Sequence, residues 1–227
     1  YGDDLASELG EAQAFVPCSK EDDIVEVLAG VLGDAAPRAS TSADAQSPWA
    51  ASPASYVKIS DGCDRFCSFC AIPYIRGRYH SFPLETVRAS VAERVEAGVR
   101  EITLIAQDTG RWGEDFAEPS NTAALLATLA DEFPQTWFRL MYIEPQGVSD
   151  ELLDVIASKP NVCKYLDMPL QHASKPVLRA MNRRGDENSH RELVARIRER
   201  VPGITLRTTL IAGFPGETDV DFDVLQN

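Results

Sequence analysis

From residue 56 onward the chain alternates short apolar runs with longer amphipathic stretches, and this pattern limits its fold more than any other feature. The runs typical of strands are residues 56–60, 101–106, 137–143, 162–168 and 204–211. The stretches typical of helices are residues 84–97, 122–133, 149–158 (with Ser149 as N-cap), 175–182, 189–201 and 217 onward. Strand–helix alternation at this spacing predicts an α/β fold with five parallel strands and right-handed crossovers.

The residues before this alternation have a different composition. Residues 21–32 carry a helical apolar stripe, and Gly33 is a plausible helix stop. Residues 34–55 are mainly Ala, Ser, Pro, Thr and Asp without a period, which is typical of a linker. We therefore expect three parts, 1–33, 34–55 and 56–227.

Charge and composition exclude some functions. Lys and Arg number 22 and Asp and Glu 35, a net charge of −13, so the chain is a poor candidate for wrapping nucleic acid and suits a basic partner better. No run approaches the roughly 18–20 apolar residues that a membrane helix needs. Without a signal-peptide pattern or an initiator Met, we expect a cytoplasmic chain that starts partway through a longer protein.

The cysteines point to a metal centre. Their odd number, five, argues against a disulfide scaffold in a chain without a secretory signal. Cys63, Cys67 and Cys70 form a CxxxCxxC cluster, whereas Cys163 begins an apolar strand and is expected in the core.

The cysteine cluster lies where a ligand site is expected. Parallel βα folds bind ligands at the carboxyl ends of the strands, and here those loops are residues 61–79, 107–113, 144–147, 169–174 and 212–218. Three thiolates in the first loop suit a 4Fe-4S cluster with one iron left open to a ligand. We expect Phe66 and Phe69 to keep water from the cluster. A structural zinc site with His80 as fourth ligand is the main alternative, and three plain thiols the other.

The cluster, with Phe69 before its last cysteine and directly after the first strand, resembles the radical S-adenosylmethionine (SAM) superfamily. In that family the open iron chelates SAM, and one electron from the cluster cleaves it to methionine and a 5′-deoxyadenosyl radical. That radical abstracts hydrogen from an unactivated C–H bond. The resemblance implies a partial (βα) barrel in which Cys63, Cys67 and Cys70 are the catalytic metal ligands, with a 4Fe-4S cluster and SAM as cofactors.

Further motifs resemble the methylthiotransferase branch of the superfamily, namely residues 57–63 (VKISDGC), 72–73 (IP), 76–77 (RG) and 213–218 (GFPGET). Residues 106–109 (AQDT) and 165–174 (YLDMPLQHAS) are similar to the RimO type, which methylthiolates an aspartate of ribosomal small-subunit protein twelve and takes the methyl group from a second SAM. The MiaB type, which modifies an adenosine in tRNA, carries Gln-Asn and Gln-Ser-Gly at these two places and is the runner-up. A non-catalytic zinc-binding module is the alternative from another class.

The resemblance also implies residues that contact SAM. Phe69 belongs to the cysteine motif, and Gln107 and Asp108 end the second predicted strand, where polar groups bind the SAM amino group. Asp108 could instead cap the following loop. Gln171 and His172 end the fourth strand and would face the SAM or substrate cavity, although His172 could be an ordinary hydrogen-bonded loop residue.

The fifth predicted strand and its loop supply the remaining candidates. Arg207 could pair with the SAM carboxylate or form an ion pair within the barrel. Gly213 and Gly216 either make a tight turn or let the backbone approach SAM, and Glu217 follows in the same motif. Arg183 and Arg184 we expect to be solvated.

The chain departs from the family at both ends. Relatives carry an N-terminal α/β domain whose three cysteines hold a second 4Fe-4S cluster, and residues 1–33 resemble only its tail, with Cys18 matching none of the three. The sixth barrel strand and a TRAM domain would follow residue 227. We therefore expect a fragment that carries the radical-generating centre but not the sulfur-donating one, and that is inactive alone as a methylthiotransferase. Its expected partners are ribosomal small-subunit protein twelve or the small ribosomal subunit and an electron donor such as a flavodoxin, with no membrane.

Overall fold

The computed structural model describes residues 9–16, 20, 23–33 and 52–227, and divides the chain into units 1–46 and 47–227. The described structure of the first unit is helix α2 (Ile24–Leu32). It ends at Gly33, which has a φ of +54° and donates its N–H to the Ala29 carbonyl, so the predicted helix and its stop are confirmed over these residues. Cys18 and most of the predicted linker lie outside the described residues. The three-part division stays a prediction.

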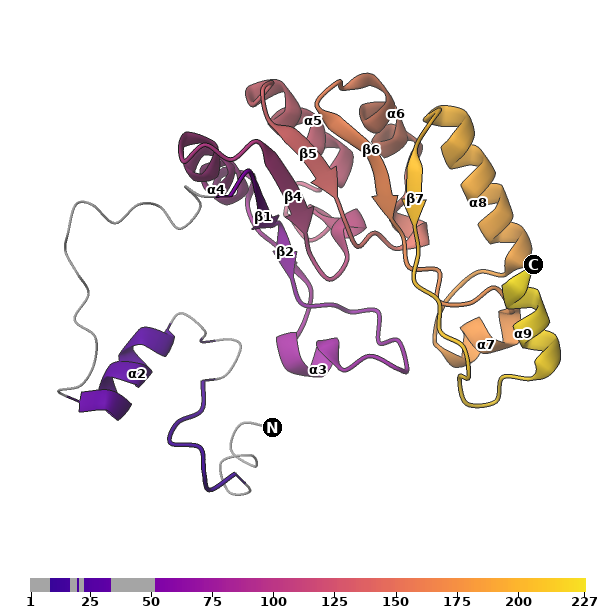
Figure 1. Cartoon of the computed structure of the whole chain (residues 1–227), viewed down its shortest axis with the longest axis horizontal. Helices are drawn as coiled ribbons and strands as arrows, with labels where there is room; N and C mark the ends of the chain where they lie inside the picture. Colours follow the sequence, from indigo (N-terminus) through magenta and orange to yellow (C-terminus); the bar gives the residue numbers. More distant parts are fainter. Residues whose placement is uncertain (1–8, 17–19, 21–22, 34–51) are drawn as a thin grey trace. The chain divides into compact units, whose positions relative to one another are not determined.

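The second unit is built on a parallel sheet whose five strands follow one another in chain order (Figure 1). These strands are β1 (Ala54–Lys58), β4 (Glu101–Ile105), β5 (Trp137–Leu140), β6 (Val162–Asp167) and β7 (Thr205–Arg207). Each pairs in parallel with its neighbours in that order. This sequential order is the one that a (βα) barrel needs, so the predicted partial barrel is confirmed.

Helices follow the strands and cover one face of the sheet (Figure 1). They are α4 (Leu84–Glu96), α5 (Thr122–Glu132), α6 (Asp150–Ser158) and α8 (Glu187–Arg200). The core lies between these two layers and includes Val57, Leu104, Phe138 and Leu166 from the strands. The other face of the sheet carries exposed aromatic side chains such as Tyr56 and Trp137.

Shorter elements fill the loops at the carboxyl ends of the strands. They are β2 (Ser60–Asp61), α3 (Ile72–Arg76), β3 (His80–Ser81), the 3₁₀ turns η3 (Thr109–Arg111) and η4 (Pro145–Gly147), α7 (Lys175–Ala180) and α9 (Asp219–Gln226). Among the described residues, no helix combines the length and apolar character that crossing a membrane takes.

Predicted and observed boundaries differ most in β5 and β7. The apolar runs 137–143 and 204–211 predict longer strands, but the ladders end at Leu140 and Arg207. Beyond these points the chain turns into the loops, where Tyr142 has a φ of +61° and Leu210 keeps only an isolated bridge to Gln171. Ser149 caps α6 as predicted, accepting a hydrogen bond from the Leu152 N–H at 3.1 Å.

Candidate active site

The cysteine loop is closed by the antiparallel pair β2 and β3. The Cys63 N–H donates to the Gly77 carbonyl at 3.2 Å, and just before it Gly62 turns the chain with a φ of +72°. A Cβ at Gly62 would lie 2.1 Å from the Arg78 carbonyl oxygen, so no other residue fits. The loop is therefore held at its base by backbone geometry.

The three thiols of this loop are free and lie close enough to influence one another. Burial raises the pKa of Cys63 and of Cys67, which are 9% and 8% exposed, while Cys70 is partly exposed. Two of the sulfurs face N–H donors. The Arg65 backbone N–H lowers the Cys63 pKa, and the Arg183 guanidinium lies 3.8 Å from the Cys67 sulfur.

These donors are what metal-bound thiolates need, because an N–H directed at a sulfur stabilises its negative charge. The donor set therefore fits an iron–sulfur cluster, whose thiolates each bind a different iron. A single zinc ion would require all its ligands within about 2.0–2.3 Å. Among the residues that the structure describes, no three His, Cys, Asp or Glu side chains are arranged around one ion, and His80 is exposed. The described side chains therefore do not form the zinc site with His80 that the sequence left open.

The two phenylalanines of the loop are on the surface. Phe66 is 45% exposed and Phe69 is 40% exposed. The Phe66 ring contacts the edge of Tyr74, with 6.2 Å between the ring centres. The shielding of the cluster from water by these rings and a contact of Phe69 with SAM therefore stay predictions.

The neighbours Gln107 and Asp108, which follow β4, have different surroundings. Asp108 is fully buried and accepts from Arg65 Nε at 2.9 Å and Nη2 at 2.8 Å, and its other oxygen accepts from the Gly110 N–H at 3.2 Å. The loop-capping alternative is thus observed. Gln107 has a buried Oε1 without a hydrogen-bond partner within the described structure, so it is the better placed of the two for a ligand.

Predicted residues after β6 and β7 come together. His172 is completely buried, and its Nδ1 accepts from the Ser174 N–H at 2.9 Å, which leaves Nε2 as the protonated nitrogen of the neutral ring. Nε2 lies 3.7 Å from Glu217 Oε2. Glu217 is itself buried and accepts from the Phe214 N–H at 2.9 Å, so it fixes the glycine loop beside His172.

The glycine loop is a tight turn with free space on its side. Gly213 and Gly216 have φ values of +77° and +88°, which explains both glycines conformationally. A Cβ at either would meet nothing within 4 Å. There is room for a ligand here, and an approach of SAM to this loop stays a prediction.

The other candidates near these loops are ion-paired or bridging. Arg207 Nη1 lies 3.2 Å from Asp167 Oδ2, so the ion-pair alternative is observed. Burial raises the pKa of Asp167, and Arg207 opposes this. Gln171 has a φ of +68° and exchanges backbone hydrogen bonds with Thr209 and Ile211, which joins the loops after β6 and β7.

The prediction for Arg183 is wrong. Its side chain is only 6% exposed, lies 2.5 Å from Glu144 Oε1 and donates to the Pro169 carbonyl at 2.7 Å. Burial raises the pKa of Glu144 to about 6 although Arg183 lowers it. A buried carboxylate such as Glu144 needs a partner of opposite charge. The sequence does not reveal the pair, because Glu144 lies in the loop after β5, far from Arg183 in the chain. Arg184, as predicted, is exposed.

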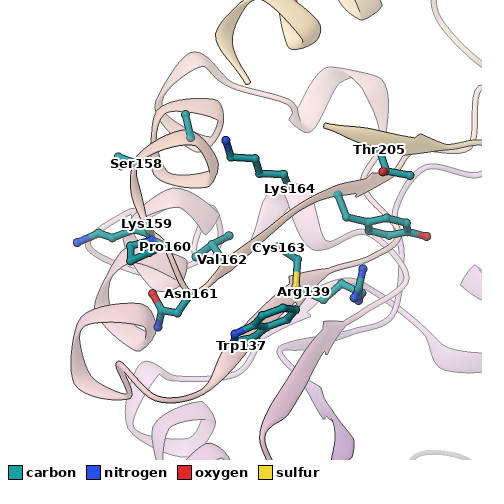
Figure 2. A pocket seen from close by; sticks show the side chains of 12 residues that line it. Trp137, Arg139, Ser158, Lys159, Pro160, Asn161, Val162, Cys163, Lys164 and Thr205 are labelled. Atoms are coloured by element: carbon teal, nitrogen blue, oxygen red, sulfur yellow. The ribbon is translucent and has the colours of Figure 1, made fainter. Parts of the chain in front are cut away.

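Cys163 is also not a core residue. It is partly exposed and lines a cavity of about 540 Å³ at the amino-terminal ends of β5 and β6 (Figure 2). Trp137 and Arg139 line the same cavity, and the Arg139 guanidinium lies 4.8 Å from the centre of the Tyr165 ring. The apolar run 162–168 does not show which of its side chains face the helices and which face the open side of the sheet. For that reason it did not reveal the exposure of Cys163.

Comparison with known proteins places this site in a family. The model of the Radical SAM superfamily matches residues 57–226, about three quarters of the chain. The chain belongs to the radical SAM superfamily. Its fold agrees, since a radical SAM methyltransferase, TsrM from Kitasatospora setae, aligns over 76% of this chain with a TM-score of 0.61 at 16% identity, covering 33% of that chain. HemN from Escherichia coli, a radical SAM enzyme, aligns over 77% of this chain and 40% of its own with a TM-score of 0.52 at 19% identity.

Curated relatives of this radical SAM chain carry a more specific name. The ribosomal protein uS12 methylthiotransferase RimO of Geobacter sulfurreducens is 49% identical over 170 residues, which are 75% of this chain and 38% of that protein. The protein of the same name from Symbiobacterium thermophilum is 41% identical over 232 residues, 99% of this chain and 48% of the relative. The chain thus spans less than half of the length of these two relatives.

Proposed function

We propose that this chain is the radical-generating part of a RimO-type methylthiotransferase, which adds a methylthio group to the β-carbon of an aspartate in ribosomal protein uS12. The observation that carries the proposal is the identity of 49% over 170 residues to a relative of that name. The residues that match the radical SAM model, 57–226, contain the three cysteines and the loops after the strands.

Cys63, Cys67 and Cys70 would hold a 4Fe-4S cluster. When bound, this cluster supplies the electron that cleaves SAM and so starts hydrogen abstraction from the substrate. The thiols must lose their protons to bind iron, and burial opposes this at Cys63 and Cys67. The N–H donors at these two sulfurs offset part of that cost, so the loop is built for thiolates.

SAM would lie between the loops after β4, β6 and β7. Gln107 offers a buried amide oxygen without a partner in the described chain, which suits the SAM ammonium group. Gly213 and Gly216 leave open space beside their backbone. Glu217 holds this loop in place through the Phe214 N–H, and its carboxylate lies 3.7 Å from His172 Nε2, which has no hydrogen-bond partner among the described residues. In this proposal Asp108 acts through Arg65, which it fixes beside Cys63.

The substrate that we propose is the one in the names of these relatives. A net charge of −13 suits a basic ribosomal protein, whether free or within the small ribosomal subunit. We propose that the reaction takes place in the cytoplasm. We also propose an electron donor of the flavodoxin kind and a second 4Fe-4S cluster in the domain that precedes residue 1 in relatives.

Two measurements test the proposal. The chain is reconstituted with iron and sulfide without air, and about four irons per chain and the formation of 5′-deoxyadenosine from SAM under a strong reductant are expected. Mass spectrometry of uS12 from cells with and without the full-length gene should show loss of one methylthio group on an aspartate. A colourless chain with one zinc would end the proposal that Cys63, Cys67 and Cys70 hold a 4Fe-4S cluster. An unchanged uS12 with loss of methylthio-adenosine from tRNA would instead support the MiaB type.

A further inference from the structure

A segment that lies far from the cysteines in sequence holds the cysteine loop. Residues 180–183, the last residue of α7 and the three that follow it, form the contact, and we call them the clamp segment. The Ser68 N–H donates to the Met181 carbonyl at 3.1 Å, and the Ser68 hydroxyl donates to the Ala180 carbonyl at 2.9 Å. Ser68 stands between Cys67 and Cys70, so these bonds fix the middle of the motif.

Asn182 adds two hydrogen bonds on the other side of Cys67. Its side-chain amide donates to the Arg65 carbonyl at 3.2 Å and to the Phe66 carbonyl at 3.1 Å. Phe66 has a φ of +49° and Asn182 has a φ of +56°. Residues other than glycine adopt this left-handed backbone region only at a cost in free energy. The clamp segment therefore bonds to the cysteine loop on both sides of Cys67.

Arg183 ends the clamp segment and reaches the sulfur itself. Its Nη1 lies 3.8 Å from Cys67 Sγ and 2.5 Å from Glu144 Oε1, and its Nη2 donates to the Pro169 carbonyl at 2.7 Å. The guanidinium thus ties together the loops after β2, β5 and β6. With side chains 6% and 11% exposed, Arg183 and Glu144 form a shielded ion pair directly beside one cluster ligand.

We propose that Arg183 is a positioning residue that sets the reduction potential of the cluster through Cys67, and that Glu144 offsets its charge. The proposal rests on the proposed function, because it assumes that Cys67 binds the cluster. A hydrogen bond and a positive charge at a ligand sulfur favour the reduced cluster, which carries one more negative charge. The Glu144 carboxylate acts in the opposite direction on the same cluster, and burial strengthens both effects because water screens them little.

The test measures the midpoint potential of the reconstituted cluster by EPR-monitored titration, together with iron content. Arg183→Ala should move the potential to more negative values by about 59 mV, a tenfold change in the one-electron equilibrium. Arg183→Lys keeps the charge and should restore most of that shift. Glu144→Gln keeps an acceptor for Arg183 but removes the negative charge, so it should move the potential to more positive values. Arg184→Ala, at the exposed neighbour, is the matched control and should leave the potential unchanged.

The opposite signs separate tuning from a merely structural role. A structural role would lower iron content in both variants and shift their potentials in one direction or not at all, and that result overturns the inference. If Arg183→Ala holds no iron, the sign of the Glu144→Gln and Arg183→Lys shifts decides. Equal shifts for Arg183→Ala and Arg184→Ala also overturn it. Failure of the unchanged chain to bind iron would refute the proposed function instead, so the two failures are distinguishable.

Discussion

The loops at the carboxyl ends of the strands bury different kinds of groups from those at the amino ends. We call these two regions the carboxyl edge and the amino edge of the sheet. At the carboxyl edge, Cys67, Asp108, Glu144 and His172 are buried and most are hydrogen-bonded across loops that are distant in sequence. At the amino edge a larger cavity of about 540 Å³ contains one cysteine, Cys163. The cavity next to the cysteine loop measures about 390 Å³. The larger cavity therefore does not lie at the candidate active site. Buried reactive side chains are a better guide to that site than cavity volume.

The largest expected difference between the two edges concerns their cysteines, Cys67 and Cys163. Cys67→Ala removes a proposed cluster ligand, so formation of 5′-deoxyadenosine from SAM should fall below detection in the reconstituted chain. Cys163→Ala, at the amino edge, should keep both iron content and SAM cleavage at the level of the unchanged chain. The product is measured by chromatography after anaerobic reduction. Retained cleavage in Cys67→Ala, or equal loss in both variants, would show that the carboxyl edge is not special.

A glycine at each edge offers the second comparison. Gly62→Ala would place a methyl group 2.1 Å from the Arg78 carbonyl, so the base of the cysteine loop must open and iron content should fall several-fold. Gly203, between α8 and β7, has a similar φ of +80°, but a methyl group there would meet no atom within 4 Å. Gly203→Ala should therefore keep its iron and cost only about 1–2 kcal/mol, as expected for an alanine in the left-handed region. Equal iron content in the two variants would contradict the role of the close approach.

Much of the fold could be predicted from the sequence, because strand and helix periods are local signals. The five parallel strands and the cap at Ser149 are such features. The cysteine motif and its position after the first strand are local as well. The lengths of β5 and β7 were not predictable from the apolar runs. After Leu140 the backbone keeps single hydrogen bonds to Leu104 and Asp167 but turns at Tyr142, and after Arg207 it bonds to the loop after β6.

The partners of the site residues were harder to predict, because they depend on tertiary contacts. Nothing local pairs Arg183 with Glu144, which is 39 residues away, or Arg65 with Asp108, which is 43 residues away. The likeness of 165–174 to the RimO type pointed to His172, but its neighbour Glu217 comes from the loop after β7. Sequence analysis could therefore name these residues more readily than the contacts that orient them.

Two Arg–carboxylate pairs, one at each edge, allow the two edges to be compared by the free energy of unfolding that each pair contributes. Arg65→Ala leaves Asp108, with 1% of its side chain exposed, without its charge partner, and should lower the free energy of unfolding by about 2–3 kcal/mol. Arg139→Ala breaks a pair with Glu101 in which both side chains are about one quarter to one third exposed, and should cost about 1 kcal/mol. Urea denaturation of the iron-free chain measures both. A larger effect of Arg139→Ala would reverse the ranking of the two edges.

The smallest expected effect is a pH dependence that belongs to the carboxyl edge. The pKa of Glu144 is about 6 in the folded chain, above its ordinary value of 4.5, because burial favours the neutral carboxyl. The folded state therefore binds this proton more tightly, so the contribution of Glu144 to stability is greatest below pH 4.5 and is lost as the pH rises through 6. Between pH 5 and 7 the loss should be about 1 kcal/mol.

Urea denaturation of the iron-free chain at pH 5 and pH 7 checks this pH dependence. The difference in unfolding free energy between the unchanged chain and Glu144→Gln should fall by about 1 kcal/mol between those pH values, because glutamine does not titrate. Glu101→Gln, at the amino edge, is the matched control and should not show this change. A difference that stays constant for Glu144→Gln, or one that both variants share, would mean that the buried pair beside Cys67 does not hold its proton as the geometry implies.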